Sequence, residues 1–154
     1  MRNKVLVFDM DGTIANLYGV KGWLEDLQSE STRPYDVAEP LFDMDVLNVL
    51  LTTLQDLGWK IAITSWLSKN GSFMYDLEVE DSKKAWLERY DFPYDFINIV
   101  RYGKDKSECT EDLGGYQILI DDEEPNRKAW KNGKAIAPNN LVDFLLDLIE
   151  KEVG

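Results

Sequence analysis

The chain has 154 residues, 44% hydrophobic and 30% charged, which is enough for one domain with its own hydrophobic core; we expect a single domain over residues 1–154. Its formal net charge of −12, with no stretch dense in Lys and Arg, disfavours long nucleic acids as partners, because duplex binding requires a basic face. Histidine is absent and Cys109 is the sole cysteine, which excludes a zinc cluster and an internal disulfide and leaves proton transfer to carboxylates, Lys, Tyr, hydroxyls or Cys109.

The first apolar run covers residues 4–8 and ends directly at Asp9. It is too short for a signal peptide, and no run of about 18 apolar residues follows it anywhere in the chain. We therefore expect a cytoplasmic protein without a membrane partner. The run also lacks polar alternation, which is typical of a strand buried on both faces.

Four later runs have the same short, apolar character and predict four more strands. They cover residues 60–64, 96–100, 116–120 and, more weakly, 134–137. The fourth strand of the series, "YQILI", again ends on two carboxylates, Asp121 and Asp122.

Helical patterns lie between these runs. In residues 44–58 leucines recur at helical spacing and Gly58 gives a natural C-terminal stop. Further helices are predicted over 79–91, 124–133 and 139–152, the last behind an Asn cap. Strands that alternate with helices indicate an α/β fold: a doubly wound, Rossmann-like parallel sheet of about five strands with helices on both faces.

Residues 14–42 depart from this alternation. The segment is polar and rich in turn formers, holds Pro34 and Pro40, and contains one short predicted helix over 20–28. We expect it to form a small cap or flap over the edge of the sheet. The stretch over 66–80, "WLSKNGSFMYDLEVE", is expected to add a loop over the same crevice.

Polar residues follow several of the predicted strands. Ligands of such sheets bind beyond the carboxyl ends of the strands, so these residues should meet at one edge. Carboxylates crowded there repel each other unless a cation holds them, and oxygen ligands of this kind suit Mg²⁺. The residues concerned are Asp9, Asp11, Thr64, Ser65, Lys104, Lys106, Asp121 and Asp122.

The same residue types can carry out phosphoryl transfer. One aspartate can attack a phosphoryl group as a covalent nucleophile, and a second can protonate the leaving oxygen and then activate water. A lysine and a hydroxyl would offset the charge on the transferring oxygens.

The motifs resemble those of the haloacid dehalogenase (HAD) superfamily of phosphohydrolases. The resemblance rests on "DMDGT" at residues 9–13, a hydroxyl after the second strand, a lysine, and "ILIDD" at 118–122, and it extends over roughly residues 4–126. An aspartate two residues after the nucleophile is found in phosphatases and phosphomutases of the family rather than in dehalogenases. The resemblance therefore implies phosphoryl transfer.

Position by position, the resemblance implies that Asp9 is the nucleophile and a Mg²⁺ ligand, and that Asp11 is the general acid and base, with its backbone carbonyl on the metal. Thr64 matches the phosphate-binding hydroxyl, with Ser65 as the alternative register. Lys106 is preferred to Lys104, because its Asp-Lys-Ser setting is similar to that of deoxyribonucleotidases.

The remaining assignments concern metal and substrate. Asp122 matches the metal-binding aspartate, and Asp121 supports it. Gly12 and Thr13 are assigned to substrate binding together with Ser65 and Trp66, whose ring could stack on a nucleobase.

The resulting hypothesis is a Mg²⁺-dependent phosphomonoesterase that acts through an aspartyl-phosphate on a small phosphorylated metabolite such as a nucleoside monophosphate, as a monomer or homodimer. A phosphorylated nucleic-acid end is an alternative substrate. Alternatives without catalysis are a HAD-fold protein that only binds a phosphorylated ligand and a signalling receiver domain. A receiver should carry its phosphoacceptor aspartate after the third strand, where this sequence has none.

Overall fold

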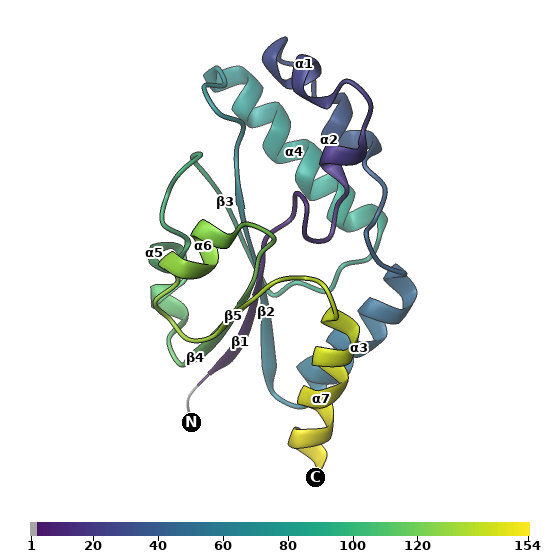
Figure 1. Ribbon diagram of the computed structural model, residues 1–154, viewed down its shortest axis with the longest axis vertical. Coiled ribbons are helices and arrows are strands. Elements are labelled where there is room, and N and C mark those ends of the chain that lie inside the picture. Colours follow the sequence, from purple (N-terminus) through teal and green to yellow (C-terminus); the bar gives the residue numbers. More distant parts are fainter. Residues whose placement is uncertain (1–2) are drawn as a thin grey trace.

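The computed structural model describes residues 3–154 and contains one sheet of five parallel strands (Figure 1). Along the sheet the order is β3-β2-β1-β4-β5. This confirms the predicted Rossmann-like α/β fold. The strands are β1 (Lys4–Phe8), β2 (Trp59–Trp66), β3 (Phe96–Val100), β4 (Tyr116–Ile120) and β5 (Ala135–Ile136).

Both faces of the sheet are covered. Leu6 and Phe8 of β1 belong to a core that includes the leucines of two helices, α3 and α7, whereas Val5 and Val7 pack with Trp130 on the opposite face. This alternation explains why residues 5–8 contain no polar residue. The longer helices are α3 (Met44–Asp56), α4 (Phe73–Arg89) and α7 (Leu141–Val153), and the shorter ones are α5 (Lys106–Cys109), η2 (Glu111–Leu113) and α6 (Glu124–Ala129).

The strand order reverses beside β1. Strands β2 and β3 lie on one side of β1 in the sheet, and β4 and β5 lie on its other side. The crevice between the carboxyl ends of β1 and β4 is therefore the topological switch point, where ligands of open α/β sheets bind. Receiver domains have the order 2-1-3-4-5 instead. The receiver alternative is therefore wrong for this chain.

Helix α4 begins earlier than the sequence pattern predicted. Its first residue is Phe73 rather than Val79, because the Ser72 hydroxyl accepts the backbone N–H of Tyr75 and caps the helix. Exposed Phe73 and Met74 blurred the amphipathic pattern there. The loop expected over 66–80 is therefore shorter than predicted: it covers residues 67–72, between the end of β2 at Trp66 and the start of α4 at Phe73.

The 14–42 segment contains three short helices rather than one. They are η1 (Leu17–Gly19), α1 (Trp23–Gln28) and α2 (Arg33–Val37). Helices α1 and α2 lie beside the first half of α4, above the carboxyl edge of the sheet (Figure 1). Leu17 and Tyr35 of this segment pack with Tyr75 and Val79 of α4 in a separate buried cluster.

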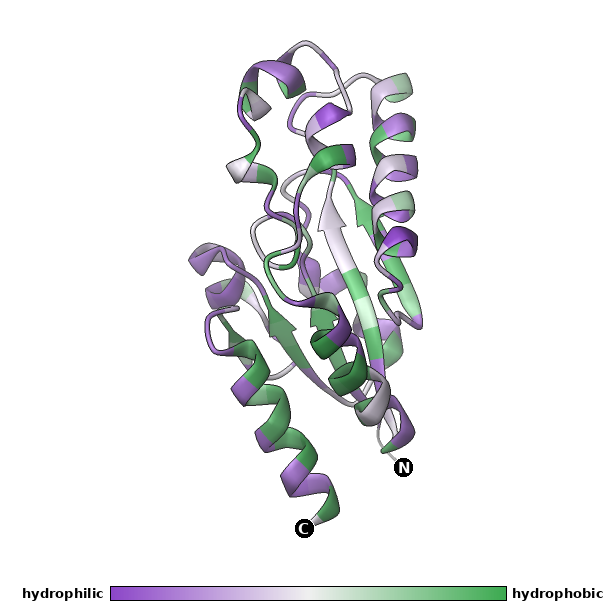
Figure 2. Ribbon diagram, turned by 90° about the vertical axis from the view of Figure 1, so that its right-hand side faces the viewer, coloured by the Kyte–Doolittle hydropathy of each residue, from purple (hydrophilic) through white to green (hydrophobic). Residues whose placement is uncertain are grey.

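Three smaller differences concern the last third of the chain. Strand β5 has two residues instead of four, and α6 ends at Ala129. Asn140 precedes α7 but makes no side-chain capping bond, since its backbone is left-handed. In Figure 2 the helices carry bands of hydrophilic and hydrophobic residues, and within residues 3–154 none of them is long and apolar enough to cross a membrane.

Candidate active site

Asp9 lies at the switch point because of the strand register. Phe8, the last residue of β1, pairs with Ile63 of β2 and Ile120 of β4. Thr64 and Asp121 therefore follow at the same level as Asp9 on either side of it. The backbone N–H of Asp9 still donates to the carbonyl of Ile120, at 3.0 Å, so the backbone position of this buried aspartate is fixed by the sheet.

A tight turn after Asp9 positions its carboxylate. The hydroxyl of buried Thr13 lies 2.9 Å from Oδ2 of Asp9 and 3.2 Å from Oδ1 of Asp122, and it accepts the backbone N–H of Asp122. Gly12 has φ of +82°, and a Cβ there would lie 2.2 Å from Oδ2 of Asp122. Glycine is needed at this position because a side chain would displace the carboxylate of Asp122.

Lys106 binds two of the carboxylates. Its ammonium lies 2.9 Å from Oδ1 of Asp9 and 2.7 Å from Oδ2 of Asp121. Burial lowers the pKa of this lysine, but the charges of Asp9 and Asp121 more than offset that effect, and its pKa is raised. Lys104 is exposed, so Lys106 is the lysine that the fold brings to the carboxylates.

Three carboxylates form the group that could hold a metal ion. Oxygen atoms of Asp9, Asp121 and Asp122 lie within 4.8 Å of one another. Burial, and then the charge of Asp9, raise the pKa of Asp122 to about 8. A site in which carboxylates resist ionisation next to each other is one that a divalent cation would stabilise.

The hydrogen bonds distinguish Asp121 from Asp122. Oδ2 of Asp121 accepts from Lys106 and from Asn126, and its Oδ1 accepts the backbone N–H of Glu123 at 2.9 Å. Asp122 is less buried, and its contacts are with Thr13. The carboxylate of Asp122 accepts fewer hydrogen bonds and is therefore freer to bind a metal, whereas Asp121 orients Lys106.

The carboxylate of Asp11 lies outside this metal group and contacts a lysine that the sequence pattern did not indicate. The ammonium of Lys83, on α4, lies 2.9 Å from Oδ2 of Asp11 and 2.7 Å from the Ser65 hydroxyl. Burial raises the pKa of Asp11, the charge of Lys83 lowers it, and the net direction is upward. A lysine in a charged helical stretch is expected to be exposed, so nothing in the local sequence indicated that Lys83 is buried at the site.

The two candidate hydroxyls at the end of β2 have different surroundings. Ser65 is bound to Lys83. Thr64 is fully buried beside Asp9, and its hydroxyl has no hydrogen-bond partner among residues 3–154. A buried hydroxyl without a partner is costly, and an anionic oxygen of a ligand would satisfy it. Thr64 is therefore the better candidate for a phosphate contact.

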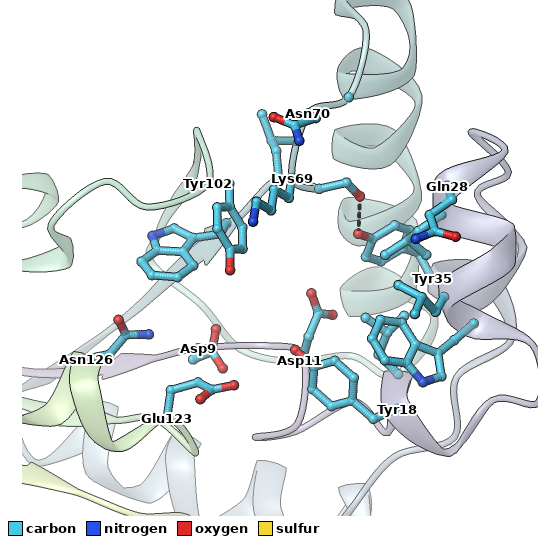
Figure 3. Close-up of a pocket in the computed structure, with 18 of the residues that line it drawn as sticks. Asp9, Asp11, Tyr18, Gln28, Tyr35, Lys69, Asn70, Tyr102, Glu123 and Asn126 are labelled. Carbon is cyan, nitrogen blue, oxygen red and sulfur yellow. Dashed lines mark hydrogen bonds between the residues drawn. The ribbon is translucent and has the colours of Figure 1, made fainter.

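A cavity of about 850 Å³ opens above Asp9 and Asp11 (Figure 3). Its walls come from α1, α2, the loop after β2, the loop after β3 and the start of α6. Of the four residues assigned to substrate binding, Trp66 lines this cavity, and Gly12, Thr13 and Ser65 do not. Thr13 bonds to Asp9, Gly12 lies against the carboxylate of Asp122, and Ser65 is bound to Lys83.

Aromatic rings stand on two sides of this cavity. Trp66 and Tyr102 form a pair with centroids 5.0 Å apart, and Tyr18 and Trp23 form a second pair at 4.9 Å. The indole N–H of Trp66 donates to the carbonyl of Lys104, which fixes its ring beside Lys106. In Figure 3, Tyr102 and Tyr18 lie on opposite sides of the two aspartates. Sequence alone did not indicate Tyr102 or Tyr35 as lining residues.

Fold and site together define a doubly wound α/β protein with three carboxylates and a buried lysine at its switch point. A similar solved structure is that of a protein of Mesorhizobium loti assigned as a HAD-like phosphatase: TM-score 0.58, 12% identity, covering 98% of this chain and 88% of that one. Another is D,D-heptose 1,7-bisphosphate phosphatase of Burkholderia thailandensis, with TM-score 0.49 and 13% identity, covering 96% and 99%.

This chain therefore has the fold of the HAD-like phosphatases. Comparison of the sequence itself adds nothing to this result: no family model and no curated protein matches it.

Proposed function

We propose that this protein is a Mg²⁺-dependent phosphomonoesterase that acts through an aspartyl-phosphate on Asp9. The observation that carries the proposal is the position of the Asp9 carboxylate. It lies at the floor of the cavity between the Thr13 hydroxyl and the Lys106 ammonium, with Thr64 at the same level in the sheet. A nucleophile, charge-neutralising groups and a substrate space thus meet at one point.

The reaction has two steps. In the first, an oxygen of Asp9 attacks phosphorus, the bond from phosphorus to the ester oxygen breaks, and the Asp11 carboxyl gives its proton to the leaving alcohol. In the second, Asp11 accepts a proton from water as the water attacks phosphorus. The bond to Asp9 then breaks, and orthophosphate and the free carboxylate result. Lys106 and the Thr64 hydroxyl would bind the phosphoryl oxygens in both steps.

The carboxylates of Asp9 and Asp122 would hold Mg²⁺, with Asp121 supporting the site, and Asp11 adding its backbone carbonyl. When bound, the cation lowers repulsion between the carboxylates and the incoming phosphate and stabilises the developing charge. The fit of these residues to a cation rests on their mutual distances and on the raised pKa of Asp122.

The substrate we propose is a nucleoside monophosphate. Residues 14–42 would act as a small cap, because α1 and α2 supply one wall of the cavity. A cavity of about 850 Å³ has room for a base and a sugar, and aromatic rings such as Trp66 and Tyr102 favour a flat group. The net charge of −12 disfavours a long polynucleotide, so a phosphorylated nucleic-acid end remains the second candidate.

Phosphate release from p-nitrophenyl phosphate and from a panel of phosphorylated metabolites, with and without Mg²⁺, tests the proposal. We expect turnover that requires Mg²⁺ and is lost in Asp9→Asn. Acid quenching should trap a phosphorylated peptide that contains Asp9. Turnover that survives Asp9→Asn would exclude this mechanism. Absence of turnover from every ester, with Mg²⁺ still bound, would favour a protein that only binds a phosphorylated ligand.

A further inference from the structure

Lys83 is a buried cation whose presence the core does not require. Its side chain is only 1% exposed, and it lies on the inner side of α4, between the 14–42 segment and the end of β2. Removing an ammonium from water costs several kcal/mol, and an apolar side chain of similar volume is often as good or better for stability. The reason for burying Lys83 at this position should therefore lie in the groups that it contacts.

All three ammonium protons of Lys83 have acceptors. They are Oδ2 of Asp11 at 2.9 Å, the hydroxyl of Ser65 at 2.7 Å and the backbone carbonyl of Trp66 at 2.8 Å. The Tyr35 ring, with its centroid 5.1 Å away, covers the ammonium further. Asp11 is the single charged partner, and it is a residue that lines the cavity.

This geometry leaves one carboxylate oxygen of Asp11 for the substrate. Lys83 holds Oδ2, and β2 holds Lys83 through the Ser65 hydroxyl and the Trp66 carbonyl. The carboxyl group of Asp11 is thus fixed against rotation, with Oδ1 as the oxygen that Lys83 does not bind. In Figure 3 the carboxyl group of Asp11 stands in the cavity between Asp9 and Tyr35.

We infer that Lys83 is a positioning residue that holds the Asp11 carboxyl in the orientation needed for proton transfer to the leaving oxygen. The inference rests on the proposed phosphomonoesterase function. Lys83 itself does not touch the substrate, because its three protons are already bound. Its contribution is the alignment of a donor, to which proton-transfer rates are sensitive.

The experiment compares Lys83→Met with Lys84→Met on esters with two kinds of leaving group. Lys84 is the neighbouring residue on the same helix; its side chain is 47% exposed and lies 3.7 Å from Glu80. p-Nitrophenyl phosphate releases an acidic phenol that needs little protonation, whereas glycerol phosphate releases an alcohol that needs a proton. General acid catalysis contributes about 10²- to 10⁴-fold where it is needed.

We expect kcat of Lys83→Met to fall at least about 10-fold further on glycerol phosphate than on p-nitrophenyl phosphate, with KM little changed, since only the acid is misplaced. Lys84→Met should behave as the wild-type protein on both esters. An equal loss on the two esters would show that Lys83 serves only the fold, and would overturn the inference.

A double-mutant cycle gives a second, independent decision. If Lys83 acts through Asp11, then Lys83→Met should change kcat by less than about twofold once Asp11→Asn is present. Additive losses would overturn the inference.

Ser65→Ala covers the case in which Lys83→Met does not fold. This variant removes one hydrogen-bond partner of Lys83 and should give the same dependence on leaving group, to a smaller degree. A folded Ser65→Ala variant that loses the same activity on both esters would contradict the inference.

Failure of the proposed function would be visible before any Lys83 variant is made. A wild-type protein that releases no phosphate with Mg²⁺ from these two esters or from any other ester of the panel would remove both the function and the inference. A wild-type protein that requires Mg²⁺ and Asp9, but whose Lys83→Met variant has no leaving-group dependence, would remove the inference alone.

Discussion

The ammonium of Lys106 lies 2.9 Å from Oδ1 of Asp9, although 97 positions separate the two residues in the chain. It also lies 2.7 Å from Asp121, so one buried cation is shared by carboxylates from the ends of two neighbouring strands. The position depends on α5, whose cap Asp105 accepts the backbone N–H of Ser107 and starts the helix at Lys106.

Replacement of Lys106 by Met should therefore impair both catalysis and stability. Loss of one charge-stabilising group at the transferring oxygens costs about 10²- to 10³-fold in kcat. Removal of one partner from a buried ion pair costs about 3–5 kcal/mol in the free energy of unfolding. Steady-state kinetics and urea unfolding measure the two effects.

Lys104→Met is the matched control for Lys106→Met, because Lys104 is two residues away and exposed. Its side chain makes no ion pair within residues 3–154, and its carbonyl, which accepts from Trp66, is kept in the variant. We expect wild-type kcat and stability. A large loss in Lys104→Met with little change in Lys106→Met would show that the two lysines have the opposite roles.

Gly12→Ala should weaken metal binding. A Cβ at Gly12 would lie 2.2 Å from Oδ2 of Asp122 and 2.9 Å from the Tyr18 ring, so the carboxylate has to move. The positive φ adds about 1–3 kcal/mol of backbone strain. Calorimetric titration with Mg²⁺ should show at least a tenfold weaker affinity, about 1.4 kcal/mol.

Gly103→Ala separates the clash from the strain. Gly103 has φ of +88°, close to that of Gly12, but a Cβ there would meet nothing within 4 Å. This variant should lose stability without a change in Mg²⁺ affinity. Equal losses of affinity in the two variants would mean that backbone strain, rather than the position of Asp122, controls the metal site.

The sequence predicted the two aspartate-bearing strand ends well, because a short apolar run that stops at Asp is a strong local signal. The roles of Asp9 and Asp122 came from spacing and resemblance, and the structure brings these residues together. Lys83 was missed because its burial depends on α4 rising beyond the sheet edge, where α2 covers it. Nothing near Lys83 in the sequence records that contact between distant segments.

The choice between Thr64 and Ser65 shows the same limit. Both are hydroxyl residues at the end of β2, and sequence cannot separate them because a shift of one residue turns a side chain to the other face of the sheet. The register of Ile63 with Phe8 puts Thr64 beside Asp9, and the Ser65 hydroxyl contacts Lys83. Side-chain direction at a strand end depends on pairing, which is a tertiary property.

The stability of the metal-free protein should fall as pH rises through the range in which Asp122 ionises. The folded pKa of Asp122 is about 8, against an ordinary value of 3.8. Between these values the folded state keeps a proton that the unfolded state has lost, so unfolding becomes easier as pH rises. The charged groups around it are Asp9, Asp121 and Glu123.

Thermal unfolding between about pH 5 and pH 8, with and without Mg²⁺, measures this dependence. We expect Tm to decrease with pH in the metal-free protein and the increase in Tm given by Mg²⁺ to grow, because the metal competes with protons for the same oxygens. Asp122→Asn should flatten the pH dependence of the metal-free Tm and reduce the increase in Tm given by Mg²⁺. A metal-free Tm that rises across this range in the wild-type protein would contradict the assignment.

Trp66 provides the test of the substrate class. Stacking of a base on an aromatic ring contributes about 1–3 kcal/mol, so Trp66→Ala should raise KM for a nucleoside monophosphate at least about fivefold. KM for glycerol phosphate, which has no flat group, should change little. The indole N–H of Trp66 also donates to the carbonyl of Lys104, so Trp66→Ala removes both a ring and a hydrogen bond. Trp66→Phe is therefore measured as a second variant, because phenylalanine keeps a ring and loses only the hydrogen bond.

If stacking is the role of Trp66, then Trp66→Phe should recover most of the affinity for the nucleotide. If the role is to hold the loop before Lys106, both variants should lose kcat on both substrates, since the lysine would move from Asp9 in each case. Tyr116→Ala, which removes an exposed aromatic residue at the start of β4, at the edge of the sheet opposite Asp9, is the control and should leave both constants unchanged. Equal KM increases for nucleotide and glycerol phosphate would exclude a base-stacking role and favour a substrate without a flat group.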